Sequence, residues 1–111
     1  MKERDLHKAV AAYLDACLPA NTYWTTIPGG DGARTMAPGY KRGCPDILVI
    51  HAGFSLFIEL KGPKGSVSKA QESTFIRLGL AGARAVVCRS LDEVEEALFC
   101  AGVPIKARIS A

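Results

Sequence analysis

Two short apolar segments near the middle of the chain constrain its fold more than any other feature. The segment from Asp46 to His51 and the segment from Ser55 to Lys61 are rich in aliphatic and aromatic residues, and they are joined around Ala52-Gly53. Strand-like composition on both sides of so short a connection is typical of a β-hairpin. The loop is either the two residues 52–53 or the four residues 51–54, and both give the same strand register.

That register brings charged side chains together on one face of the hairpin. Asp46 lies opposite Glu59, and directly opposed residues have Cβ atoms about 5 Å apart. Lys61, two residues beyond Glu59, projects from the same face. Two adjacent carboxylates repel each other unless a cation intervenes. Lys61 supplies one positive charge, and hard oxygen ligands suit Mg²⁺ or Mn²⁺ as a second.

An exposed cross-strand salt-bridge cluster is the alternative explanation of these three residues. Against it, Glu59 lies within the apolar run 56–60, where burial on both faces of the strand is expected. A buried carboxylate is costly unless it is paired or bound to a metal. Asp46 also directly follows a long glycine-rich, basic loop, a type of segment that is commonly functional.

The remaining pattern predicts an α/β fold with a mixed sheet flanked by helices. The last strand can pair parallel to an earlier one through a right-handed crossover. Capping-box patterns at Ser68–Gln71 and Ser90–Glu93 each predict a helix start. The expected elements, in the order α-β-β-β-α-β-α, are helix 3–18, strand 22–27, loop 28–43, strands 46–51 and 55–61, loop 62–67, helix 69–80, strand 84–89 and helix 91–101.

Composition limits the classes of protein that remain. A chain of 111 residues suits one domain, here residues 1–111. The four cysteines form no zinc motif and no evident disulfide framework; buried free thiols are expected at Cys17, Cys88 and Cys100, which suits a reducing compartment. No signal peptide or membrane-spanning stretch is evident, so a cytoplasmic protein is expected. Between residues 34 and 77, seven basic residues outnumber three acidic ones, which favours a polyanionic partner.

The same residues carry a family resemblance. Pro45-Asp46 followed by Glu59-Leu60-Lys61 resembles the PD-(D/E)xK pattern of the nuclease superfamily that includes restriction enzymes and junction resolvases. More narrowly, the chain resembles the virus-type replication-repair nuclease (VRR-NUC) domain, through the segments 43–46, 57–65 and 68–71 and an acid-bearing first helix. The resemblance covers nearly the whole chain, and it implies the restriction-endonuclease-like αβββαβ core.

The resemblance implies a role for individual positions. It makes Asp46 and Glu59 metal ligands, Lys61 the catalytic lysine, Glu3 a helical acid near the metal, and Gln71 a glutamine near the same site. Two of these residues also have an explanation that requires no function. An acid such as Glu3 is favoured at a helix N-terminus, and Gln71 occupies the third position of a capping box. The residues expected to contact phosphates of a nucleic acid are Lys41, Arg42, Lys64 and Lys69.

The resulting hypothesis is a Mg²⁺- or Mn²⁺-dependent endonuclease that hydrolyses DNA phosphodiester bonds. Small stand-alone members of the resembled family look like phage or prophage proteins and resemble junction-resolving enzymes. A structure-selective enzyme acting on branched DNA, such as a Holliday junction, is therefore expected, as a homodimer that presents two sites to two strands. The alternatives are a non-catalytic nucleic-acid-binding module and a protein with a purely structural role.

Overall fold

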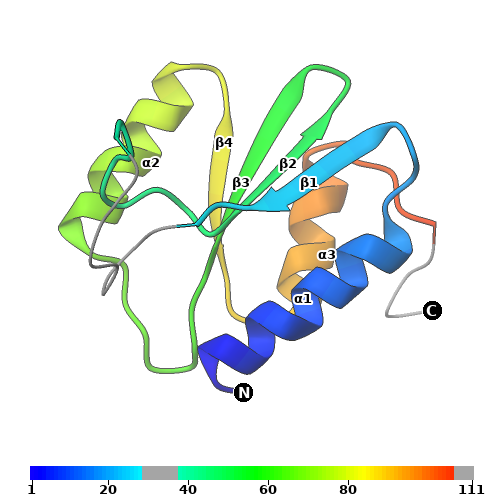
Figure 1. The fold of residues 1–111 in the computed structure, drawn as a ribbon, viewed down its shortest axis with the longest axis horizontal. Coiled ribbons are helices and arrows are strands. Elements are labelled where there is room, and N and C mark those ends of the chain that lie inside the picture. Colours follow the sequence, from blue (N-terminus) through cyan, green and yellow to red (C-terminus); the bar gives the residue numbers. More distant parts are fainter. Residues whose placement is uncertain (29–37, 107–111) are drawn as a thin grey trace.

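The structure, a computed structural model, describes residues 1–28 and 38–106, and its seven elements follow the predicted order (Figure 1). Residues 29–37, within the predicted loop, lie outside the described part. Each observed bound agrees with the predicted one or differs from it by a single residue. They are α1 Glu3–Cys17, β1 Thr22–Thr26, β2 Ile47–His51, β3 Phe54–Leu60, α2 Lys69–Leu80, β4 Arg84–Cys88 and α3 Leu91–Cys100.

A two-residue turn connects β2 and β3. His51 pairs with Phe54, and Ala52 and Gly53 both have positive φ angles, 51° and 79°. Positive φ at both central residues is the signature of a type I′ turn, whose twist matches that of the flanking strands. The predicted register is confirmed, with Ile50 opposite Ser55.

The four strands form one mixed sheet in the order β1-β2-β3-β4. The first three strands are antiparallel, and β4 is parallel to β3, with Leu60 opposite Cys88. Helices α1 and α3 lie together on one side of the sheet, while α2, which connects β3 to β4, lies apart from them (Figure 1). The predicted α/β layer fold with a mixed sheet is thus confirmed.

The hydrophobic core lies between the sheet and the α1–α3 layer. Alternate strand residues, including Ile47, Val49 and Ile58, are fully buried there, because successive side chains of a strand point to opposite faces. Leu14 of α1 and Leu98 of α3 complete the packing. The residues that alternate with these along the chain point to the other face of the sheet, toward α2. They include Asp46, Glu59 and Lys61.

Helix α2 is held in a different way from α1 and α3, because none of its twelve residues is buried. Its start is fixed by the predicted capping box: the Gln71 backbone N–H donates to Ser68 Oγ at 3.1 Å, and the Ser68 N–H donates to Gln71 Oε1 at 2.9 Å. The second capping box forms only in part. Ser90 Oγ accepts from the Glu93 N–H, but the Glu93 carboxylate accepts from the N–H of Arg89 instead of Ser90.

Burial was predicted for three cysteines and is confirmed at two of them. Cys17 and Cys88 are buried free thiols, as predicted, but Cys100 is exposed. The prediction was wrong at Cys100 because this last residue of α3 lies on the helix face turned away from the core. Among the residues described, no helix is long and apolar enough to cross a membrane.

Ala52 gives a test of the hairpin geometry. A non-glycine residue with a left-handed backbone is strained, whereas Asn tolerates it and Asn-Gly is the preferred type I′ pair. We expect Ala52→Asn to raise the free energy of unfolding by about 0.5–1 kcal/mol, measured by urea denaturation. Gly53→Ala, which adds a Cβ at a second positive φ, should lower it. A destabilised Ala52→Asn variant would contradict the assigned turn.

Candidate active site

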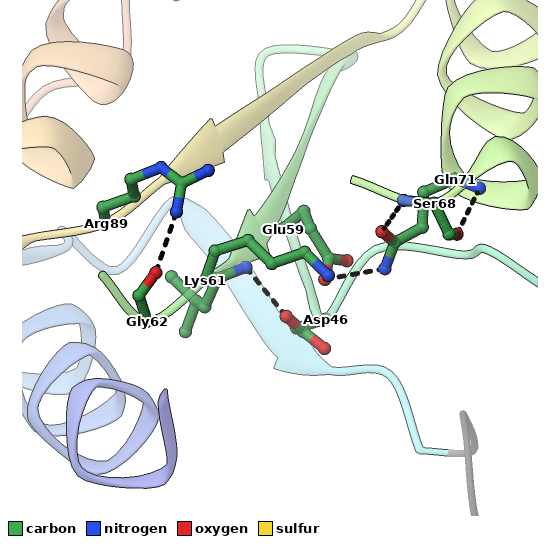
Figure 2. Close-up of polar contacts among 8 residues, drawn as sticks. Asp46, Glu59, Lys61, Gly62, Ser68, Gln71 and Arg89 are labelled. Atoms are coloured by element: carbon green, nitrogen blue, oxygen red, sulfur yellow. Dashed lines mark hydrogen bonds and ion pairs between the residues drawn. The ribbon is translucent and has the colours of Figure 1, made fainter. Parts of the chain in front are cut away.

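Asp46 lies one residue before β2 and uses its carboxylate to extend the hairpin. Its Oδ2 accepts a hydrogen bond from the Leu60 N–H at 2.8 Å, and its backbone oxygen accepts from the Ile27 N–H at 2.7 Å (Figure 2). The regular β2–β3 ladder ends at the Ile47–Ile58 pair, so the Asp46 side chain continues the pairing where backbone pairing stops. Asp46 therefore has a fixed position beside the end of β3.

Glu59 is the most deeply buried acid of the site, with 3% of its surface exposed. Lys61 Nζ lies 3.4 Å from Glu59 Oε2, and Gln71 Nε2 donates to the same oxygen at 2.9 Å. Figure 2 shows both side chains converging on this carboxylate from β3 and from α2. The other oxygen, Glu59 Oε1, is buried and has no hydrogen-bond partner among the described residues. A buried carboxylate oxygen without a partner is unusual and points to a ligand.

The electrostatics of the cluster agree with its geometry. Burial, and secondarily the negative charge of Asp46, raise the pKa of Glu59 to about 7, while Lys61 acts in the opposite direction. Glu3 makes a smaller contribution that also raises this pKa. The lysine alone therefore does not offset the cost of two neighbouring carboxylates. An additional cation at this place would offset it.

These residues line a common cavity of about 280 Å³. Its walls come from the end of the β2–β3 hairpin, the start of α1, the turn before β2 and the first turn of α2. All five predicted catalytic or metal-binding residues line the cavity, and so does Arg42. The complete lining is Glu3, Ile27, Tyr40, Arg42, Gly43, Cys44, Asp46, Glu59, Lys61, Ser68, Ala70 and Gln71.

Glu3 lies at the edge of this arrangement. It is exposed, in the first turn of α1, and lines the cavity without contacting Asp46 or Glu59 through any hydrogen bond described here. Within residues 1–28 and 38–106, no group of three or more His, Cys, Asp or Glu side chains is arranged to hold a metal ion. Asp46, Glu59 and Glu3 therefore stay predictions as metal ligands.

The predicted phosphate-contacting residues are all exposed, and they divide into two sets. Arg42 lines the cavity, whereas Lys41, Lys64 and Lys69 do not. Lys41 is next to Arg42 in the turn before β2, and Lys69 is the first residue of α2 beside Ser68. Of the four, Arg42 thus lines the cavity that holds the acids, and contact of these bases with phosphates stays a prediction.

No role was predicted for Cys44, yet this residue lines the cavity. Burial, followed by the charges of Glu59 and Asp46, raises the pKa of its thiol. Its place two residues before Asp46 was the available signal. The raised pKa keeps the thiol neutral, which makes it a poor nucleophile.

Two opposed carboxylates, a lysine and a glutamine at one edge of a mixed α/β sheet are consistent with the restriction-endonuclease-like class of fold. The VRR-NUC domain model matches residues 33–92, more than half of the chain, and the chain therefore belongs to the VRR-NUC family of nucleases. The match includes Asp46, Glu59, Lys61 and Gln71 and leaves Glu3 outside. Searches of curated proteins and of solved structures found no match.

The raised pKa of Glu59 predicts a pH dependence of stability in metal-free buffer. The folded state binds this proton more tightly than the unfolded state, whose pKa is near 4.5. The free energy of unfolding should therefore fall as pH rises from about 4.5 to 7, by at most about 3 kcal/mol. The measurement is urea denaturation with EDTA across this range.

Glu59→Gln is the control for that experiment, because it keeps the shape of the side chain and cannot ionise. The difference between wild type and this variant isolates the contribution of Glu59 from groups that titrate in both proteins. Mg²⁺ or Mn²⁺ should stabilise the wild type most at the higher pH values, where the carboxylate is charged. A wild-type-minus-variant difference that does not change with pH would contradict the assigned pKa.

Proposed function

We propose that this chain is a divalent-metal-dependent endonuclease that hydrolyses DNA phosphodiester bonds. The observation that carries the proposal is the buried Glu59 carboxylate. Lys61 and Gln71 contact one of its oxygens, and the other oxygen has no hydrogen-bond partner in the part of the chain that the structure describes, although Asp46 lines the same cavity. A purely structural ion pair gives no reason to bury a second acid next to the first. A metal ion bound by both acids gives such a reason.

Asp46 and Glu59 are the residues that would hold the ion, through oxygen donors that suit Mg²⁺ or Mn²⁺. When bound, such an ion polarises a phosphoryl oxygen and lowers the pKa of a coordinated water. The residues of the chain set the geometry for this chemistry. Gln71, locked by its capping box, orients the Glu59 carboxylate.

Lys61 is the proposed catalytic lysine. Its ammonium group, whose side chain is only 13% exposed, sits beside Glu59 and inside the cavity. There it can orient the attacking water and offset the negative charge that develops on the phosphorus centre. Neighbouring phosphates of the DNA strand would be held by the exposed bases Arg42, Lys41, Lys64 and Lys69. Contacts of this kind position the substrate without recognising its base sequence.

A cleavage panel tests the proposal directly. Labelled single strands, duplexes, flaps and four-way junctions are incubated with Mg²⁺, with Mn²⁺ and with EDTA, and products are separated on denaturing gels. We expect cutting that requires the metal and favours branched DNA. Binding of DNA without cutting under any of these metals would instead support a non-catalytic binding module.

Asp46→Asn is the sharpest variant for the same assay. The amide retains an acceptor for the Leu60 N–H but loses the charge, so the hairpin should persist while metal binding weakens. We expect cleavage to fall at least about a hundredfold, with DNA affinity unchanged or increased because a negative charge is lost. Asp46→Ala should show the same loss of cleavage, with an added loss of stability.

Asp92→Asn on the exposed start of α3 is the matched control and should cut like the wild type. Equal cleavage by Asp46→Asn and wild type would overturn the assignment of this acid.

We further propose that the enzyme acts as a homodimer, since a two-fold axis would present two sites to the two strands of a branched substrate. A single 111-residue domain with one described cavity of this kind offers one set of acids per chain. Light scattering after gel filtration should give a mass twice the 11.8 kDa of the chain. A monomer at concentrations that cleave junctions would contradict this part of the proposal.

A further inference from the structure

The turn that carries Arg42 is attached to α2 by contacts that involve neither acid of the site. Thr74 Oγ1 donates a hydrogen bond to the Arg42 backbone oxygen at 3.0 Å. The turn is closed on itself by the Cys44 N–H, which donates to the Lys41 oxygen at 3.3 Å. Arg42 is thereby bound to the second turn of a helix that follows it by about thirty residues in sequence.

Gly43, the next residue of this turn, lies directly against the backbone of α2. Its φ is +83°, and a Cβ at this position would clash with the Ala70 backbone oxygen and lie 2.8 Å from the Gln71 nitrogen. Only a residue without a side chain allows the turn to approach the helix backbone this closely. The turn and the first turn of α2 are therefore packed backbone to backbone.

Helix α2 is the element that brings the two halves of the site together. Gln71 reaches from its first turn to Glu59, and Thr74, one turn later, holds the Arg42 backbone. Because no residue of α2 is buried, polar contacts such as these contribute much of what fixes the helix relative to the hairpin. As a consequence of these two contacts, Arg42 and Gln71 line the same cavity.

We propose that Thr74 is a positioning residue for substrate binding, which acts by holding the Arg42 turn at the mouth of the cavity. This inference rests on the proposed nuclease function and assigns Thr74 no contact with the substrate. An exposed arginine binds a phosphate more tightly when its backbone is already fixed, because less conformational entropy is lost on binding. The Thr74 hydroxyl supplies that fixation from outside the reacting groups.

Thr74→Val tests the inference, because valine keeps the shape and β-branching of threonine and removes only the donor. DNA affinity is measured by fluorescence anisotropy on a labelled four-way junction with Ca²⁺ in place of Mg²⁺, and cleavage is measured with Mg²⁺. We expect the dissociation constant and KM to rise about three- to tenfold, the equivalent of one neutral hydrogen bond. The kcat at saturating DNA should change less than twofold.

Two companion variants separate positioning from a general structural effect. Thr74→Ser restores the hydroxyl and should restore the affinity. Ser73→Ala, the neighbouring and exposed hydroxyl of the same helix, should leave affinity unchanged. Failure of Thr74→Ser to recover the affinity, or an equal loss in Ser73→Ala, would overturn the inference.

A double-mutant cycle with Arg42→Ala identifies the residue through which Thr74 acts. If Thr74 works through Arg42, adding Thr74→Val to Arg42→Ala should cause no further loss of affinity. A loss as large as in the wild-type background would overturn the proposal while the nuclease assignment stands. Absence of cleavage by the wild type would instead count against the nuclease function, and the affinity cycle would still decide the role of Thr74.

Discussion

The buried carboxylate of Glu59 is the constraint on which the rest of the site depends. Glu59 lies on the face of β3 that is turned away from the α1–α3 core, and its burial there removes a charged group from water. Two neighbouring side chains limit the cost of this burial. Lys61 and Gln71 satisfy one oxygen, and the capping box fixes Gln71. Asp46 adds a second negative charge instead of a compensating positive one. The arrangement is electrostatically incomplete without a further cation, which is why a metal-dependent reaction explains it better than a structural role.

The fold supplies two separate supports for this group. The α1–α3 layer buries the alternate residues of β2 and β3 and so fixes the hairpin from one side. Helix α2 approaches from the other side, where none of its residues is fully buried, and hydrogen bonds join it to Glu59 and to the Arg42 turn. The stable half of the domain thus carries the acids, and the more weakly packed half carries the glutamine and the turn with Arg42.

Much of this arrangement followed from local pattern. The short connection and apolar alternation fixed the register of β2 and β3, so the juxtaposition of Asp46 with the end of β3 was predictable. The capping box at Ser68 and the order of elements were predictable for the same reason, since they depend on residues close in sequence. Cys100 and the Ser90 capping box were predicted less well, because a helix end has several partners available and the sequence does not rank them.

The sequence by itself determined the register of the hairpin that brings Asp46 to the end of β3, and the family to which the chain belongs. Only the tertiary structure decided that Gln71 reaches Glu59, and that one Glu59 oxygen has no partner among residues 1–28 and 38–106. It also decided that Gly43 and Thr74 join the Arg42 turn to α2. The physical reason is range. Register and capping arise between near neighbours on the chain, whereas these contacts join residues 12 to 32 positions apart and exist only once the helix has packed across the sheet.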